Sequence, residues 1–406
     1  MSLTGRAVGR WPARALLVVT SLALSILFLE AACRVYVLVF RAEAPPTDSE
    51  LAGEPPLPYA HADYLSPRFF QEQLRAFTHV PAASGPHMLL NDVAGQYFNV
   101  VKGLRLTTNQ PPHPARRILV FGGSTVLSQE VPDQHTIPSY LQRMINATCA
   151  TPIAVFNYGV SSMDAAQQRA RLLEAGLLPS DIVVFYDGVN EIYYTIYTGE
   201  RASDGQDPWV DRVWMAVDRA SRVSAVASMI TGIRQRTVPK TMSDASLLRD
   251  NLNRLQEKYR HELVETSRFV SAARGRFLHF LQPHLFATRA STAYRQALTR
   301  RYLPQDFLTR FRPRHPEPPP GWSLLTEAPA LDLAFQLGYP RLREAMTQAA
   351  GDGVESFDLS GLLDDERVPA EVFLDFAHVN HVANEVSAKA MFTRIAPRIG
   401  TCAVTG

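Results

Sequence analysis

Five short apolar runs alternate with segments of helical periodicity from residue 116 onwards, and this alternation limits the folds open to the chain. The runs cover residues 116–121, 153–157, 181–186, 276–281 and 354–359. Each has the length of a strand and is apolar enough to be buried on both faces. Because strands that alternate with helices form parallel sheets covered on both sides, the sequence predicts an α/β fold. We expect a single doubly wound, flavodoxin-like parallel sheet of about five strands.

Helical periodicity fills the gaps between these runs. The expected helices cover residues 136–147, 163–175, 245–273, 334–350 and 381–398, with a further helix starting near Asn190 and a candidate break at Pro340. Two segments do not fit the alternation: residues 200–240 are predicted to be a helical insertion, and residues 285–333 an irregular loop. The apolar stripe of the insertion is consistent with packing on the body, with a lid, or with a position on a membrane surface.

The N-terminal 40 residues have the pattern of a transmembrane anchor. Three arginines within residues 6–14 precede an apolar run that, taken as residues 15–40, has 26 residues. As a helix this run would be roughly 39 Å long, which is enough to cross a bilayer with some tilt. Glu30 and Arg34 interrupt it but are spaced to pair on one helix face. The arginines favour a cytoplasmic tail, residues 1–14, with the main body on the extracytoplasmic (periplasmic or outer) side.

A cleaved signal peptide is the alternative to an uncleaved anchor. The small-residue site at residues 42–44 is followed by Pro45, which disfavours cleavage, so the uncleaved anchor is preferred. After the anchor, residues 41–95 are predicted to be a linker and lead-in segment, and residues 96–406 the α/β domain.

Charge and motif spacing argue against several function classes. A net charge of +2 is not typical of a nucleic-acid-binding protein. The three cysteines, Cys33, Cys149 and Cys402, lie too far apart to spell out a zinc site. The turn at Gly122-Gly123 lacks the lysine of a phosphate-binding loop and the three spaced glycines of a dinucleotide fingerprint. No metal or organic cofactor is therefore expected.

Residues that could take part in a reaction follow the predicted strands. Residues just past the ends of parallel strands share one edge of the sheet, where open α/β folds place their reacting groups. The residues gathered there are Ser124 after the first strand, Gly159 after the second, Asn190 after the third, and Asp375 and His378 in the loop before the last helix. The sequence therefore predicts a site at this edge.

This set of residue types suits acyl transfer. A serine hydroxyl becomes a useful nucleophile when a base takes its proton, and His378 can act on Ser124 in this way. Asp375, three residues earlier, can hold the other ring nitrogen and balance the imidazolium charge. The candidate oxyanion hole consists of the backbone N–H groups of Ser124 and Gly159 and the side-chain amide of Asn190.

Two further questions concern a rival base and the walls of the site. His381 is a rival for His378, but it has no Asp three residues before it, and its position suggests only the first turn of the last helix. Residues that follow the strand ends are possible substrate-binding residues, although each could instead be a core or wall residue: Tyr158, Glu191, Tyr193, Tyr194, Gln282 and His284.

The four blocks together resemble the SGNH (GDSL-type) hydrolase superfamily. FGGST matches the first block with Ser124, NYG the second with Gly159, GVNE the third with Asn190, and DFAH the last with Asp375 and His378. The blocks occur in the family's order across residues 116 to 400. The resemblance implies a serine hydrolase with the nucleophile, oxyanion donors and base at these positions.

Two positions depart from the family pattern. Gly123 stands where the GDSL name has an acidic residue, and Glu191 stands where an Asp usually follows the block-three Asn. The chain is closer to membrane-anchored bacterial members, which often act on acylated glycans. The resemblance thus implies an esterase acting on an ester of a small molecule, glycan or lipid. An O-acyltransferase with the same triad and a catalytically silent glycan-binding or scaffold protein of envelope polymer assembly are the alternatives.

A disulfide between Cys149 and Cys402 is a further hypothesis. The two residues follow the first and last helices of the predicted domain. In a sheet of order 2-1-3-4-5, right-handed crossovers place these helices side by side on one face, with their C-terminal ends opposite the site. Two free thiols remain the alternative.

Overall fold

The computed structural model describes residues 20–21, 24–25, 27–32, 62–77, 79–82, 87–198, 224, 226, 245–288, 329–369 and 371–402. The chain divides into two units. Residues 1–45 and 205–238 form one, and residues 46–204 and 239–406 form the other, which contains the α/β fold.

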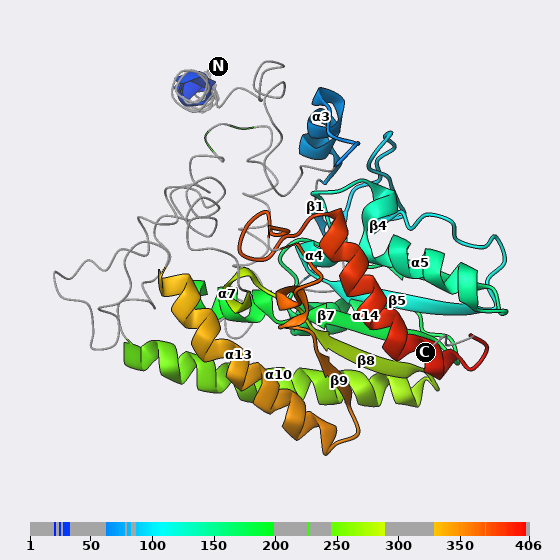
Figure 1. Ribbon diagram of the computed structural model, residues 1–406. Helices are drawn as coiled ribbons and strands as arrows, with labels where there is room; N and C mark the ends of the chain where they lie inside the picture. Colours follow the sequence, from blue (N-terminus) through cyan, green and yellow to red (C-terminus); the bar gives the residue numbers. More distant parts are fainter. Residues whose placement is uncertain are drawn as a thin grey trace, which may run out of the picture. The chain divides into compact units, whose positions relative to one another are not determined.

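A mostly parallel sheet of seven strands forms the centre of the α/β unit (Figure 1), in the order β3-β4-β6-β5-β7-β8-β9. Its five parallel strands are β5 (Arg116–Gly122), β6 (Ile153–Asn157), β7 (Ile182–Asp187), β8 (Arg276–Leu281) and β9 (Glu355–Asp358). They correspond to the five predicted strands and have the predicted order 2-1-3-4-5.

The expectation of about five strands was too low, because a short antiparallel hairpin extends the sheet beyond β6. Its strands are β3 (Val100–Val101) and β4 (Leu104–Arg105), and Arg105 pairs with Asn157 of β6. Lys102 and Gly103 form the turn with positive φ values of 53° and 71°. Two-residue strands show no measurable periodicity, so the sequence pattern could not reveal them.

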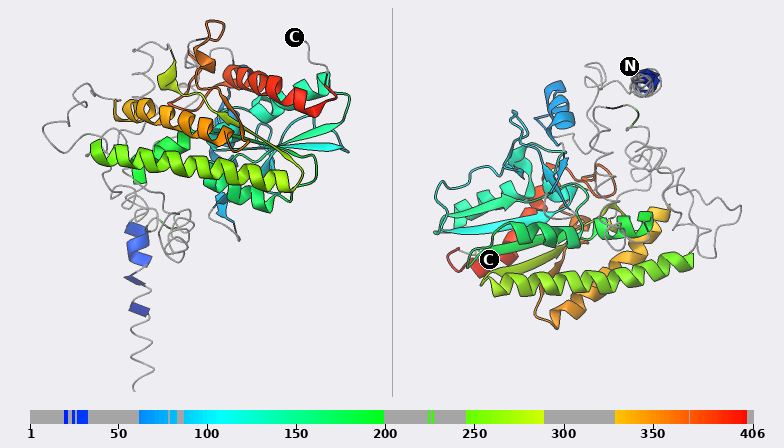
Figure 2. Two further views of the ribbon diagram at one scale, coloured as in Figure 1. Left: turned by 90° about the horizontal axis from the view of Figure 1, so that it is seen from below. Right: turned by 180° about the vertical axis from the view of Figure 1, so that it is seen from behind.

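Helices cover both faces of the sheet, as the alternation predicts (Figures 1 and 2). Helices α5 (Ile137–Thr148) and α14 (His381–Ile399) pack on the face that carries Ile118 and Val120 of β5. The other face, with Leu119 and Phe121, is covered by α6 (Ala165–Glu174), α7 (Val189–Thr198), α10 (Ala245–Ala272) and α13 (Pro329–Ala350). Pro340 lies inside α13 without ending it.

The lead-in segment contributes to the α/β unit. It contains α3 (Pro67–Ala76), which Ser66 caps by accepting a hydrogen bond from the Phe69 N–H at 3.1 Å, and the antiparallel pair β1 (His79–Pro81) and β2 (Met88–Leu90). The fully buried ring of Phe69 packs with Tyr64 and Phe98. These elements belong to the same unit as the sheet.

The predicted disulfide is present. Cys149 and Cys402 are bonded, with their Cα atoms 3.8 Å apart and a sequence separation of 253. The Ala150 N–H donates a hydrogen bond to the Thr401 carbonyl beside it, at 3.1 Å. The bond thus joins the C-terminal ends of α5 and α14.

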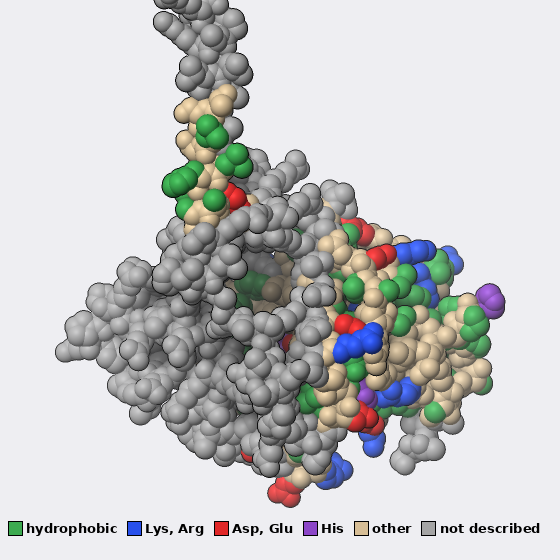
Figure 3. All heavy atoms as spheres, turned by 90° about the horizontal axis from the view of Figure 1, so that it is seen from above, with side chains coloured by type: hydrophobic (Ala, Val, Ile, Leu, Met, Phe, Trp, Pro, Cys, Tyr) green, Lys and Arg blue, Asp and Glu red, His purple; other side chains and the backbone are tan. Residues whose placement is uncertain are grey.

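The N-terminal unit is described at few positions. The Glu30 carboxylate accepts hydrogen bonds from the Ser224 hydroxyl at 2.7 Å and the Val226 N–H at 3.3 Å. Hydrophobic side chains on the helical stretch around Leu24 to Leu29 are exposed, as Figure 3 shows. Within the described residues, no helix combines the length and apolar character that crossing a membrane requires. Most of the predicted anchor, of the insertion at 200–240 and of the loop at 285–333 lies outside the described residues.

Candidate active site

The turn after β5 positions Ser124. Gly123 is the N-cap of the short helix α4 (Ser124–Leu127), and Ser124 is its first residue. A Cβ at Gly122 would overlap the Val126 side chain and lie 2.7 Å from the Tyr186 carbonyl oxygen. Only glycine therefore lets the strand turn this sharply into the helix. The serine is presented, partly exposed, at the carboxyl end of the strand.

Ser124, His378 and Asp375 lie in one hydrogen-bonded series. Ser124 Oγ is 2.7 Å from His378 Nε2, and His378 Nδ1 is 2.5 Å from Asp375 Oδ2. In the neutral ring, Nδ1 faces a carboxylate and keeps the proton, which leaves Nε2 to accept the hydrogen bond of the serine hydroxyl. Asp375 Oδ1 accepts the N–H groups of Ala377 and His378, both at 2.7 Å. The loop itself thus holds the carboxylate against the ring.

Charges around the imidazole favour its protonated form. Burial disfavours the imidazolium, but the carboxylates of Asp375 and Glu130 outweigh this effect and raise the pKa of His378 to about 10. Burial also acts on Asp375, yet His378 and the two N–H groups hold the pKa of this carboxyl below its usual range. Asp375 is therefore ionised at neutral pH and can stabilise the imidazolium.

The expected oxyanion donors lie around the same turn. One hydrogen of the Asn190 amide is donated to the Met163 carbonyl at 2.7 Å, and a Cβ at Gly123 would overlap that amide. The Gly159 N–H is donated to Asn157 Oδ1 at 2.9 Å. A Cβ at Gly159 would overlap the backbone of α4, so this glycine permits a close approach of two backbones.

Two charged residues near the site were missed at the sequence level. Glu130 Oε1 lies 3.8 Å from His378 Nε2, and Arg105 fixes the loop that carries it. Arg105 Nε donates to Asp133 at 3.0 Å, and its Nη atoms donate to the carbonyls of Leu127, Ser128 and Val131. No motif pointed to them, because Arg105 belongs to a two-residue strand and Glu130 to a loop.

Three predicted wall residues lie close to the segments that carry Ser124, Asp375 and His378. Gln282 Oε1 accepts a hydrogen bond from the Thr125 hydroxyl, next to Ser124, at 3.2 Å. The Tyr193 ring stacks on that of Phe376, with centroids 5.7 Å apart and planes at 4°. The His284 ring packs on Tyr339 at 4.0 Å, and the next residue, Leu285, donates its N–H to the Phe376 carbonyl at 3.0 Å.

The other predicted wall residues face elsewhere. Tyr158 stacks on Phe121 with centroids 4.5 Å apart and packs, partly buried, against the core. His381, the rival base, has its Nδ1 3.4 Å from the Tyr64 hydroxyl. The structure therefore turns this imidazole towards the lead-in segment.

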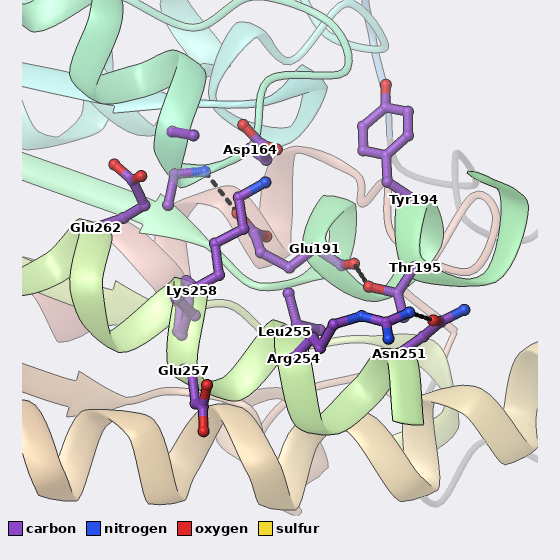
Figure 4. A pocket seen from close by; sticks show the side chains of 13 residues that line it. Asp164, Glu191, Tyr194, Thr195, Asn251, Arg254, Leu255, Glu257, Lys258 and Glu262 are labelled. Atoms are coloured by element: carbon purple, nitrogen blue, oxygen red, sulfur yellow. Dashed lines mark hydrogen bonds between the residues drawn. The ribbon is translucent and has the colours of Figure 1, made fainter. Parts of the chain in front are cut away.

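Glu191 and Tyr194 line a separate cavity of about 380 Å³ between α6, α7 and α10 (Figure 4). The Glu191 carboxylate accepts the N–H groups of Ala165 at 2.7 Å and Gly188 at 2.8 Å. Burial and the nearby Asp187 and Asp164 charges raise its pKa well above the usual value. None of the three triad residues lines this cavity. Through these two hydrogen bonds Glu191 links the first residue of α6 to the residue before α7.

Among the described residues, no group of three or more His, Cys, Asp and Glu side chains is arranged to hold a metal ion.

Comparison with known proteins gives distant structural likenesses. No protein-family model and no curated protein matches the chain. The chain is 12% identical to LAE5, an α/β hydrolase enzyme from the metagenome of Lake Arreo, covering 70% of this chain and 96% of that one with a TM-score of 0.39. It is 11% identical to a member of the lipolytic protein G-D-S-L family from Veillonella parvula, covering 70% and 99% with a TM-score of 0.36. A single-substitution variant of Axe2, an acetyl xylan esterase from Geobacillus stearothermophilus, is also 11% identical, covering 72% and 98% with a TM-score of 0.38.

Proposed function

We propose that this protein is a serine esterase that hydrolyses ester bonds through Ser124, His378 and Asp375. The observation that carries the proposal is the continuous hydrogen-bonded series from Ser124 Oγ through both ring nitrogens of His378 to Asp375, at 2.7 and 2.5 Å. Three side chains from two distant parts of the chain meet with the geometry that activates a serine hydroxyl. The position of Ser124 at a strand end supports the same reading.

The reaction would proceed through an acyl-enzyme. His378 Nε2 takes the hydroxyl proton as Ser124 Oγ bonds to the ester carbonyl carbon. When the tetrahedral intermediate collapses, the bond to the alcohol oxygen breaks and His378 returns the proton to that oxygen. Water then gives a proton to His378 as its oxygen bonds to the acyl carbon. When this second intermediate collapses, the bond to Ser124 Oγ breaks, His378 returns the proton to Oγ, and the acid leaves. Asp375 holds the ring and balances its charge in both halves.

The oxyanion would be stabilised by donors around Gly123. The Ser124 N–H is in the first turn of α4, where backbone N–H groups lack intrahelical acceptors. The Asn190 amide has a second hydrogen besides the one donated to Met163. The Gly159 N–H already donates to Asn157 Oδ1, so it would contribute only if it divided this hydrogen bond between Oδ1 and the oxyanion or left Oδ1. We therefore assign Ser124 and Asn190 the larger share of the stabilisation.

The proposed substrates are esters of small molecules, glycans or lipids, acted on outside the cytoplasm. An extracytoplasmic domain anchored by residues 15–40 is supported by the arginines before that run and by the Cys149–Cys402 bond, since disulfides persist in oxidising compartments. Protease treatment of spheroplasts tests this proposal. Digestion of the α/β unit is expected, and full protection of it would reverse the orientation.

A fluorophosphonate probe tests the esterase proposal directly, because it labels activated serines without requiring the natural substrate. The full-length protein should be labelled at Ser124 and should hydrolyse short-chain nitrophenyl esters and acetylated sugars. Release of free acid in the presence of a sugar acceptor would indicate hydrolysis, whereas acyl transfer to that sugar would indicate a transferase using the same residues. Absence of both labelling and turnover would leave a binding or scaffold role.

A further inference from the structure

The Glu130 carboxylate lies close to the imidazole of His378, which already contacts the Asp375 carboxylate. Its Oε1 lies 3.8 Å from Nε2, while Asp375 occupies Nδ1 at 2.5 Å. The side chains of Glu130 and His378 are only 13% and 17% exposed, so water screens their interaction weakly. Nε2 is also the atom that faces Ser124 Oγ at 2.7 Å. A carboxylate and the nucleophile therefore lie near the same ring nitrogen.

The loop that carries Glu130 is held in one shape by a buried arginine. Arg105 is 1% exposed, and its guanidinium lies 5.1 and 5.3 Å from the ring centroids of Phe77 and Phe98. It donates to Asp133, to the carbonyl of the last residue of α4 and to two backbone carbonyls of the loop. Burial of a charged group is costly unless it is paired and hydrogen-bonded, as this one is. The position of Glu130 is thus built into the fold.

We infer that Glu130 is a positioning residue that competes with Ser124 for Nε2 of His378 and thereby sets the pH range in which the serine is activated. The inference rests on the proposed esterase function. In the competing arrangement the ring is protonated, and Nε2–H is attracted to the Glu130 carboxylate. A protonated Nε2 cannot accept the hydroxyl proton, so Ser124 stays a poor nucleophile until the ring loses its proton.

Removal of the Glu130 charge must favour the neutral ring. Burial and the Asp375 charge raise the pKa of Glu130, whereas His378 acts to lower it. The two groups therefore titrate as a pair, and each carboxylate beside the ring raises the pKa of the imidazole. When Glu130 is made neutral, the pKa of His378 falls. The basic, active form then appears at lower pH.

Other ionisable groups surround the pair and remain in the test variants. Arg105 lowers the pKa of Glu130, and Asp375 acts on both members. Further groups lie on the elements around them: Asp133 in the same loop, Tyr64 and Asp63 in the lead-in segment, His135 before α5, and His381 at the start of α14. Because none of them changes in Glu130→Gln, a shift of the pH profile reports the charge of Glu130.

The test measures the rate of fluorophosphonate labelling of the full-length protein from pH 6 to 11, a range that includes the pKa of about 10 for His378. Wild type, Glu130→Gln and Glu366→Gln are compared, the last removing an exposed carboxylate outside the site. For Glu130→Gln the acid limb should move down by about one pH unit or more, which raises the labelling rate roughly tenfold below the wild-type midpoint. Glu366→Gln should keep the wild-type profile.

An acid limb that is unchanged in Glu130→Gln, in a protein with a wild-type melting temperature, would overturn the inference while leaving the esterase proposal intact. A wild-type protein that is neither labelled nor active on nitrophenyl acetate at any pH would overturn both. If Glu130→Gln does not fold, Glu130→Asp replaces it. The shorter side chain withdraws the charge from Nε2, so a smaller downward shift is expected, and a wild-type profile would count against the inference.

Discussion

The amide of Asn190 packs directly on Gly123, since a Cβ added to this glycine would overlap Nδ2 of the amide. The contact brings a hydrogen-bond donor from the start of α7 to the residue before Ser124. The amide fills the space beside Gly123 and donates a hydrogen bond to the Met163 carbonyl.

Gly123→Ala should therefore impair turnover more than stability. The new methyl group displaces Asn190, and a misplacement of about 1 Å can cost about 100-fold in rate. We expect kcat on nitrophenyl esters to fall by roughly 10- to 100-fold with little change in KM. Gly361→Ala is the matched control, because its Cβ would have no neighbour within 4 Å. Equal activity of the two variants would show that Asn190 does not contribute to the oxyanion site.

The two histidines of the last loop and helix should differ sharply in importance. His378→Ala removes the group that contacts Ser124 Oγ, so ester turnover should fall by several orders of magnitude, as for Ser124→Ala. His381→Ala should have a much smaller effect, because that ring lies 3.4 Å from the Tyr64 hydroxyl. Steady-state kinetics of the three variants provide the test. Comparable losses in both histidine variants would refute the assignment of His378 as the base.

The Cys149–Cys402 bond should stabilise the fold without affecting the chemistry. It links positions 253 residues apart, and the chain-entropy model gives roughly 5 kcal/mol for a loop of this size, as an upper figure. Cys402→Ser and reduced wild type should both melt at lower temperature than oxidised wild type. Reductant should have no further effect on Cys402→Ser. Below the melting temperature the rate of Ser124 labelling should stay unchanged, because the bond lies at the opposite edge of the sheet.

The sequence was sufficient to predict the parallel core and the proximity of Ser124, Asp375 and His378, because both depend on local patterns. Each parallel strand is a continuous apolar run, and Ser124, Asn190 and His378 follow strand ends or precede a helix in recognisable blocks. For the flavodoxin-like order 2-1-3-4-5, the right-handed crossovers then place the two cysteines together. These features need no knowledge of side-chain packing.

The environment of the base could not be predicted in the same way. Glu130 reaches His378 only because Arg105, on a strand of two residues, is buried and holds the loop after α4. The Gly159 N–H was expected to face the oxyanion, but it donates a hydrogen bond to the Asn157 side chain. That bond depends on the rotamer of Asn157. Such contacts arise from tertiary packing between distant segments, and a linear pattern does not encode them.

Replacement of Arg105 should be among the most destabilising changes in the unit. Its side chain is fully buried and pairs with Asp133, whose side chain is 5% exposed. Arg105→Met would leave a buried carboxylate without its cation and three carbonyls without a donor. Loss of one partner of a buried pair typically costs about 3–5 kcal/mol. Urea unfolding should show a decrease of that order in the free energy of unfolding.

Two further variants make this prediction specific. Arg367→Met removes an arginine whose side chain is 89% exposed and pairs with Asp365, and it should change the free energy of unfolding by less than about 0.5 kcal/mol. Arg105→Lys keeps the charge but lacks the planar set of donors, so it should recover only part of the loss. If Arg105→Met unfolded at the same urea concentration as Arg367→Met, the loop would not depend on Arg105. The position of Glu130 at His378 would then need another cause.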